Sequence, residues 1–245
     1  MSLIKVLYNT VLDALFPTSK AEQEVLAMDE CTAFHSLPRA KKSPIHEACS
    51  IFSYKDDRVW RLIWCIKYKK SKPAARIAGY ALFKALKTFS RAAFPIIIVP
   101  MPITKQRRRE RGFNQCELIA DEIEKLKIHS AKSMEIAAAK SNGIFIVRDL
   151  LIRTRHKSRQ TMKDREERLA STKDMFAVNQ NAADKLDTLY NIRNLPGTKI
   201  NQTPTANYLV IVIDDVVTTG STIRDAISTL REAGFEKTFG ISVAH

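Results

Sequence analysis

Two adjacent carboxylates followed by a run of hydroxyl side chains are the residues best suited to chemistry in this chain. The carboxylates are Asp214 and Asp215. The run that follows consists of Val217, Thr218, Thr219, Gly220, Ser221 and Thr222. Hydroxyl groups and the close backbone approach that glycine permits suit one phosphate. Carboxylates accept hydrogen bonds from neighbouring sugar hydroxyls and help to hold hydrated Mg²⁺. The pattern predicts a ribose 5-phosphate site, with Mg²⁺ held through Asp214 and Asp215 directly or through the ligand.

A buried strand and a helix must position these groups. Residues 208–213 form an apolar run, typical of a strand that is covered on both faces of a parallel sheet. Apolar residues then recur at helical spacing at Ile223, Ala226, Ile227 and Leu230. Such a turn lies at the N-terminus of a helix, where free backbone N–H groups attract phosphate. No lysine follows Gly220, which excludes an ordinary P-loop. Side chains alternate along a strand, so both carboxylates serve one sugar only if the chain begins to turn there.

A second apolar strand, at residues 95–99, leads into a strongly basic segment. Two prolines end it, because proline interrupts strand pairing. We expect a loop next, followed by a helix that Asn114 caps. Guanidinium groups bind doubly charged anions such as pyrophosphate bidentately. The loop residues are Pro102, Ile103, Thr104, Lys105, Arg107, Arg108, Arg109 and Arg111. Five cations in seven residues cannot all reach one pyrophosphate, so a solvated basic loop remains the alternative.

The acidic pair and its loop resemble the 5-phosphoribosyl-1-pyrophosphate (PRPP) signature of type I phosphoribosyltransferases. Within that group the chain is similar to the competence protein ComF family. The narrower match lies in residues 99–102 with 107–115, in residues 62–63 with 67–68, and in Gln160, Thr161, Arg165, Arg168 and Phe176. The resemblance spans roughly residues 50 to 245. It implies an α/β fold of the type I phosphoribosyltransferase kind, in which helices flank a central, mostly parallel sheet.

The resemblance also divides the chain into regions. It implies a small degenerate N-terminal region at residues 1–46 and a phosphoribosyltransferase-like domain at residues 47–245. Within this domain a mobile hood at about residues 150–176 would close over PRPP, with the residues Arg159, Gln160, Thr161, Arg165 and Arg168. An ordinary exposed helix is the alternative for this segment. Residues 178–207 form an insertion before the signature strand, with apolar residues for a short helix or a partner-binding patch.

The N-terminal region is the least regular part of the sequence. We predict a helix at residues 3–16 and turns from there to about residue 46, where three prolines occur. ComF-like proteins commonly carry a four-cysteine zinc ribbon here, but this chain lacks the two Cys-x-x-Cys pairs. A substitute set of zinc ligands would be Cys31, His35, His46 and Cys49. Because Cys49 falls at the start of an expected strand, we expect no zinc. The four cysteines show no paired spacing, so we expect reduced thiols.

The composition fits one core and anionic partners. A chain of 245 residues with 45% hydrophobic content can bury one sizeable core. The formal net charge of +14 favours polyanions, although a merely solubilising surface is the alternative. No apolar stretch is long enough to span a bilayer, and polar residues interrupt the first apolar segment. We therefore expect a cytoplasmic protein, and we also expect a homo-oligomer.

Two functions remain open at this point. As an enzyme, the chain would displace pyrophosphate from PRPP with a nitrogen nucleophile, a step that depends on alignment and electrostatics. Thr218 stands where 6-oxopurine salvage enzymes have an acidic residue, which disfavours purine salvage. As a binding protein, it would sense PRPP without turnover. The resemblance implies partners in natural transformation, namely single-stranded DNA and the competence helicase machinery.

Overall fold

The structure is a computed structural model, and it describes residues 17–41, 45–89, 95–133, 143–154, 175–192 and 208–245. The helix predicted at residues 3–16, the hood residues 155–174 and residues 193–207 of the insertion lie outside the described residues. None of the described helices is both long enough and apolar enough to cross a membrane.

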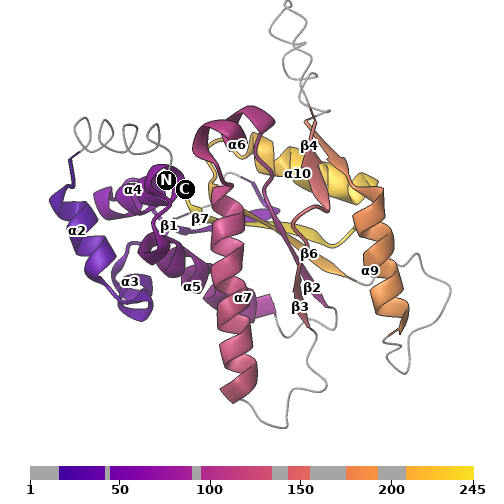
Figure 1. The fold of residues 1–245 in the computed structure, drawn as a ribbon, viewed down its shortest axis with the longest axis horizontal. Coiled ribbons are helices and arrows are strands. Elements are labelled where there is room, and N and C mark those ends of the chain that lie inside the picture. The colour runs from indigo at the N-terminus through magenta and orange to yellow at the C-terminus, as the bar shows by residue number, and fades with distance from the viewer. Residues whose placement is uncertain (1–16, 42–44, 90–94, 134–142, 155–174, 193–207) are drawn as a thin grey trace, which may run out of the picture.

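Five parallel strands form the centre of the molecule (Figure 1). Their order across the sheet is β1 (Ala48–Phe52), β7 (Thr238–Ala244), β6 (Leu209–Val216), β2 (Ile96–Pro100) and β3 (Ile144–Ile146). Each neighbouring pair is parallel, with Ile96 opposite Leu209 and Val210 opposite Thr238. The α/β class and the parallel sheet flanked by helices are thus as predicted. The strands β6 and β2 are apolar at nearly every position because helices cover both faces of the sheet.

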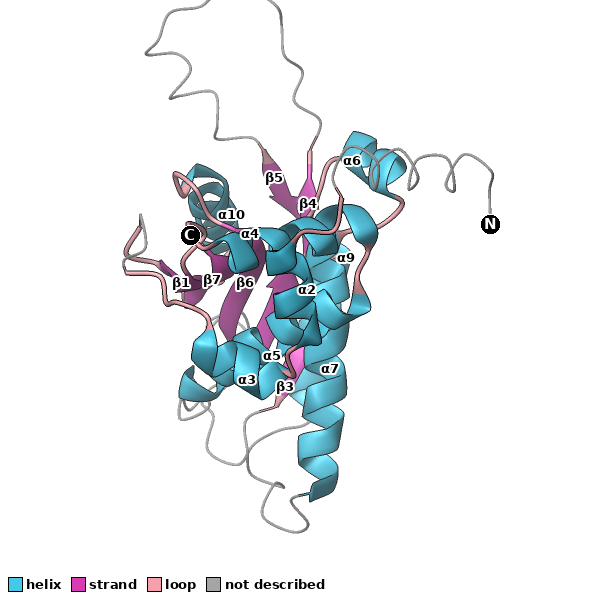
Figure 2. Ribbon diagram, turned by 90° about the vertical axis from the view of Figure 1, so that its left-hand side faces the viewer, coloured by secondary structure: helices cyan, strands magenta, loops and turns pink. Residues whose placement is uncertain are grey.

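Helices pack on both faces of this sheet. One core cluster joins the odd residues of β6, Ile211 and Ile213, to α4 (Asp57–Trp64), α5 (Lys72–Phe89) and α7 (Gln115–Ser133). The other joins the even residues, Val210 and Val212, to α9 (Gln180–Ile192) and α10 (Ser221–Glu232). Figure 2 shows α2 to α5 grouped in front of the sheet. Successive β6 residues therefore face opposite layers, as strand geometry requires.

The N-terminal region is helical where turns were predicted. Helices α2 (Lys20–Ala27) and α3 (Glu30–Ser36) replace the turn-rich segment, so that prediction is wrong. Ser19 caps α2 by accepting from the N–H of Glu22 at 3.2 Å, and Asp29 caps α3. Each helix has eight residues or fewer, too few for apolar periodicity to be evident. Both helices are held by packing, since Val25 and Ala33 are buried in the core.

The basic segment after β2 is also helical rather than a loop. Thr104 is the N-cap of helix α6 (Lys105–Arg111), and its Oγ1 accepts from the N–H of Arg107 at 3.1 Å. It ends at Gly112, which has a φ of 76°. None of its residues is buried, so no apolar pattern revealed it. The predicted cap of the next helix is confirmed, because Asn114 Oδ1 accepts from the N–H of Cys116 at 2.9 Å.

A two-stranded antiparallel sheet stands at the base of the predicted hood. It consists of β4 (Leu151–Arg153) and β5 (Phe176–Val178). Helix α9 follows directly and is the short helix that the insertion allowed. Ala182, Ala183 and Leu186 of α9 are buried in the second core cluster. The start of the insertion therefore belongs to the core rather than to the surface.

Candidate functional site

The two carboxylates lie near the carboxyl end of β6 and are almost fully buried. Asp214 is 9% exposed and Asp215 is 4% exposed. The strand continues through both residues to Val216, so the chain does not turn between them. By alternation Asp214 belongs to the α10 layer and Asp215 to the α4 layer. Even so, oxygen atoms of both carboxyl groups and Sγ of Cys116 lie within 4.8 Å of one another.

Asp214 is the more enclosed of the two. Its Oδ1 atom accepts from the N–H of Asp215 at 2.9 Å and from the thiol of Cys116 at 3.5 Å. Burial, and then the neighbouring charge of Asp215, raises the pKa of Asp214 well above the usual value of an aspartate. Burial likewise raises the pKa of the Cys116 thiol, so this thiol remains protonated and can donate.

Asp215 has a lysine partner. Nζ of Lys67 lies 2.7 Å from Oδ2 of Asp215, and the Lys67 side chain is 21% exposed against 5% for that of Asp215. Burial disfavours the charged form of Lys67, but the charges of Asp215 and Asp214 outweigh burial and raise the pKa of Lys67. The sequence indicates residues 67–68 as part of a resemblance and Lys67 as one of a group of basic residues, but it assigns Lys67 no role beside the acidic pair. The pair thus forms between residues 148 positions apart.

Lys67 is carried by a short π-helix, η1 (Cys65–Lys69). This helix continues α4 without a break and ends at Lys70, which has a φ of 51°. Such π-turns are uncommon and often occur at functional sites. On the other side of η1, Nζ of Lys69 lies 2.9 Å from Oε1 of the buried Glu22. Two carboxylates therefore hold alternate lysines of one turn.

The hydroxyl segment forms a tight turn between β6 and α10. Gly220 has a φ of 79° and is the N-cap of α10, where no side chain caps the helix. The N–H of Ser221, the first residue of α10, makes only a long contact of 3.5 Å to Oγ1 of Thr219, and an anion at this helix N-terminus can replace that acceptor. A small pocket of about 50 Å³ lies at this turn, lined by Asp214 and residues 216–223. Val217 is buried, whereas Thr218, Thr219 and Ser221 are exposed and Thr222 is half-buried.

The last residue of the sequence holds this turn in place. Nδ1 of His245 lies 2.8 Å from the carbonyl oxygen of Val217. The N–H of Val217 donates to the carbonyl of Ala244 at 3.0 Å. His245 gave no signal in the sequence, because its partner is a backbone oxygen 28 residues away.

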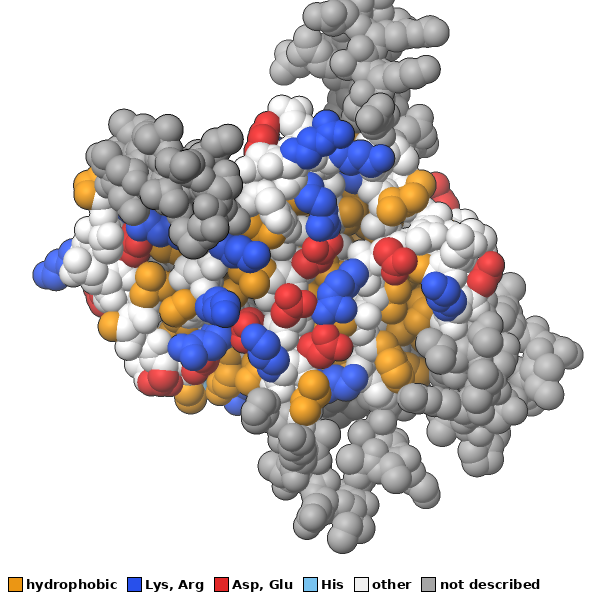
Figure 3. Space-filling model, viewed as in Figure 1, with side chains coloured by type: hydrophobic (Ala, Val, Ile, Leu, Met, Phe, Trp, Pro, Cys, Tyr) orange, Lys and Arg blue, Asp and Glu red, His pale blue; other side chains and the backbone are white. Residues whose placement is uncertain are grey.

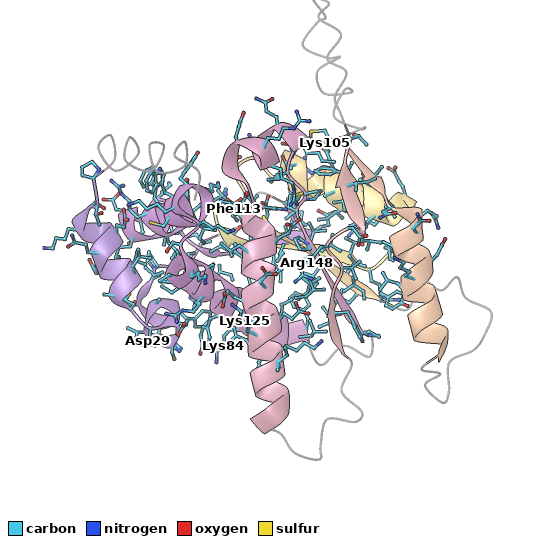
Figure 4. All side chains as sticks on the ribbon, viewed as in Figure 1. Asp29, Lys84, Lys105, Phe113, Lys125 and Arg148 are labelled. Atoms are coloured by element: carbon cyan, nitrogen blue, oxygen red, sulfur yellow. The ribbon has the colours of Figure 1, made fainter. Side chains whose placement is uncertain are left out.

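Helix α6 presents its basic side chains near the same edge of the sheet. Figure 3 shows Lys and Arg side chains at the upper edge of this face, and Figure 4 labels Lys105 there. Arg108 pairs with Glu117, and Arg111 donates to Gln115 at 3.0 Å. Arg107 and Arg109 make no ion pair with any of the described residues. Pro102, Ile103 and Thr104 lead into α6 and are half-buried.

One arginine at the base of the hood was missed by the sequence reasoning. Arg153 ends β4, is half-buried, and lies with its guanidinium 5.4 Å from the centre of the Phe176 ring. Burial lowers the pKa of Arg153, the charge of Arg107 acts in the same direction, and Asp214 acts against both. Arg153 therefore belongs to the electrostatic surroundings of the site. The predicted hood residues Arg159, Gln160, Thr161, Arg165 and Arg168 lie outside the described residues.

The metal-binding predictions concern two places. At the acidic pair, carboxylate oxygens are the donors that Mg²⁺ prefers, whereas the thiol of Cys116 is not. The residues present therefore fit Mg²⁺ through Asp214 and Asp215. Of the substitute zinc set, Cys31 is exposed on α3 and Cys49 is half-buried in β1. The absence of zinc stays a prediction.

Comparisons with known proteins give one relative. No protein-family model matches the chain. Over 138 residues the chain is 28% identical to competence protein ComFC of Bacillus subtilis (strain 168). The aligned stretch covers 56% of this chain and 39% of the length of that relative. This similarity confirms the resemblance of the chain to the ComF family of competence proteins.

Proposed function

We propose that this chain binds Mg²⁺–PRPP at the carboxyl end of β6 and acts in a competence-related process. One observation carries the proposal: a phosphate-sized turn at the N-terminus of α10 follows directly on two buried carboxylates. Hydrogen-bond donors for a phosphate thus lie next to two carboxyl groups that can accept from the hydroxyls of a diol. The similarity to ComFC of Bacillus subtilis supports the competence-related part.

Each part of PRPP has a counterpart in these residues. The 5-phosphate would bind the N–H and hydroxyl groups of residues 217–222, where the helix dipole favours an anion. The ribose hydroxyls would donate to Asp214 and Asp215. Mg²⁺, when bound, would neutralise the negative charge of the pyrophosphate. Lys105, Arg107 and Arg109 of α6 are exposed, and they would bind the same group from the other side.

If the site turns PRPP over, its residues act mainly by positioning. The turn at Gly220 would hold one end of the ligand and α6 the other, so that the anomeric carbon lies between them. The buried carboxylates would favour the positive charge that grows on the ribose ring. Pyrophosphate would leave with the electron pair of the bond to the anomeric carbon, while a nitrogen nucleophile forms the new bond. A non-catalytic PRPP sensor would need only the binding part of this arrangement.

Ligand-dependent thermal unfolding tests the proposal. PRPP with Mg²⁺ should raise the unfolding midpoint of the wild-type chain, because a ligand that binds only the folded state stabilises it. The substitution Asp215→Asn should remove most of that shift. The control Asp121→Asn changes an exposed aspartate of α7 and should keep the shift. An unchanged shift in Asp215→Asn would contradict the assigned site.

A second candidate function is binding of single-stranded DNA. The observation in its favour is the number of exposed cations on α6, namely Lys105, Arg107, Arg108 and Arg109, which exceeds the need of one pyrophosphate. Such binding should weaken steeply with salt. The aromatic residues nearby are already engaged, since Arg111 lies over the ring of Tyr68 and Lys70 over that of Phe113.

Fluorescence anisotropy with an oligonucleotide at two salt concentrations tests this function. Salt-independent binding would argue against it.

A further inference from the structure

The acidic pair already has a cation within the chain. Nζ of Lys67 lies 2.7 Å from Oδ2 of Asp215, and this oxygen is buried and receives no well-aligned hydrogen bond from the described residues. The contact is a short ion pair. Lys67 is also the more exposed partner, at 21% against 5%. A ligand or cation that approaches Asp215 from solvent meets the ammonium group of Lys67.

The turn that carries Lys67 is anchored on two further sides. Lys69 is bound to the buried Glu22 of α2 at 2.9 Å. The guanidinium of Arg111, at the end of α6, lies 5.3 Å from the ring centre of Tyr68. Neighbouring residues of η1 thus contact the N-terminal helices and the basic helix. Both contacts hold η1 against its neighbours, so a change of side-chain rotamer is the simplest way for Lys67 to leave Asp215.

We propose that Lys67 is a built-in counter-cation that keeps free divalent metal ions away from the acidic pair. Metal would then enter the site together with an anionic ligand. The oxygen atoms of the ligand would bind Lys67, and Asp215 would become available to the metal. The identity of that ligand as PRPP rests on the proposed function. The exclusion of free metal does not, because it follows from the ion pair between Lys67 and Asp215.

Electrostatics favours this order of events. A divalent ion bound by Asp214 and Asp215 would lie within a few ångströms of the ammonium group, in surroundings that water screens poorly. At an effective dielectric constant of about 20, the repulsion between two charges about 4 Å apart is large enough to weaken binding by tenfold or more. Repulsion of this order opposes metal binding while Lys67 stays in place. A phosphate or pyrophosphate oxygen removes it by accepting a hydrogen bond from the ammonium group.

Binding of Mn²⁺ alone, followed by electron paramagnetic resonance, tests the proposal. Mn²⁺ prefers the same oxygen ligands as Mg²⁺ and has a direct signal. Wild-type protein should bind it weakly. Lys67→Met, which keeps the length of the side chain and removes its charge, should bind Mn²⁺ about tenfold more tightly or better. Lys67→Arg keeps the charge and should stay weak. Lys70→Met, at the exposed end of η1, is the matched control and should behave as the wild type.

Two results would overturn the proposal. One is tight binding of Mn²⁺ by the wild-type chain that Asp215→Asn abolishes. The other is a folded Lys67→Met variant without any gain in affinity. If Lys67→Met does not fold, NMR of the wild-type protein with ¹³C-labelled lysine provides a second test. Metal-free inorganic pyrophosphate should then shift the Lys67 signal and leave the Lys70 signal in place, and an unmoved Lys67 signal counts against the proposal.

The role of Lys67 and the binding of PRPP can fail independently of each other. A chain that shows no thermal shift with PRPP, but gains Mn²⁺ affinity in Lys67→Met, would retain the counter-cation and lose PRPP as its ligand. A chain that binds PRPP and shows no difference between Lys67→Met and wild type towards Mn²⁺ would retain the proposed function and lose the counter-cation.

Discussion

The imidazole Nδ1 of His245 lies 2.8 Å from the carbonyl oxygen of Val217, at the start of the turn that leads into α10. A carbonyl oxygen can only accept, so Nδ1 must carry the proton and donate. The end of β7 thus holds the turn in place twice, through the side chain of His245, which follows the strand, and through the backbone bond from Val217 to Ala244.

Removing this contact should weaken the turn. We expect His245→Ala to lower the free energy of unfolding by about 1 kcal/mol, because a carbonyl group loses its donor. The PRPP-dependent rise in the unfolding midpoint should also decrease, since the turn would be held less firmly. Urea unfolding with and without ligand measures both effects. His46→Ala changes an exposed histidine and should alter neither; equal effects of the two substitutions would contradict this role.

Gly220 should be needed for binding as well as for stability. It has a φ of 79°, and Gly234, after the other end of α10, has a φ of 94°. Alanine at either position adopts a left-handed backbone at a cost of roughly 1 kcal/mol. Only Gly220→Ala also places a methyl group at the proposed phosphate site. Calorimetric titration with ribose 5-phosphate should show weaker binding for Gly220→Ala than for Gly234→Ala. Equal affinities would place the phosphate elsewhere.

The arginines of α6 should contribute unequally to pyrophosphate binding. Arg107 is exposed without an ion-pair partner in the described part of the chain, whereas Arg108 is paired with Glu117. We expect Arg107→Ala to weaken pyrophosphate binding by roughly tenfold, in line with a charge-assisted contact of about 1.5 kcal/mol. Arg108→Ala should have a smaller effect, and ribose 5-phosphate should bind both variants nearly as it binds wild type. The same loss in both variants would show that only the overall charge matters.

Asp214 should make stability depend on pH. Its pKa in the folded chain is raised by burial and then by Asp215, whereas in the unfolded chain an aspartate titrates at about 4. From pH 4 upward the unfolded chain gives up this proton first, so the free energy of unfolding falls with rising pH. The maximum slope is about 1.4 kcal/mol per pH unit. Asp214→Asn removes this loss and keeps an oxygen acceptor for Cys116.

The stability gain of Asp214→Asn over wild type should therefore grow as the pH rises above 4. Urea unfolding from pH 5 to pH 8 measures it. Asp29 is the opposite case, because its hydrogen bond from the Thr32 side chain lowers its pKa. The stabilisation by Asp29 is present above the unfolded pKa and lost below it, so the effect of Asp29→Asn should stay constant over that pH range. If the free energy of unfolding changed with pH in the same way for Asp214→Asn and wild type, the raised pKa of Asp214 would be contradicted.

Local patterns predicted the elements that have strong sequence signals. The apolar run before Asp214 and the helical spacing from Ile223 to Leu230 predicted β6 and α10, and both are present. Asn114 was predicted as a cap and is one. Such signals lie within about one helical turn or one strand, so they can be recognised without knowledge of the remaining fold. The three short or fully polar helices α2, α3 and α6 lacked them.

The sequence by itself determined the two buried apolar strands and the order of acidic pair, hydroxyl turn and helix, because each depends on residues close together in the chain. The tertiary structure alone decided which side chains surround the pair. Lys67 reaches Asp215 across 148 positions, and Cys116 reaches Asp214 across 98. No local pattern encodes such contacts, since they arise only when η1, α7 and β6 pack together at one edge of the sheet.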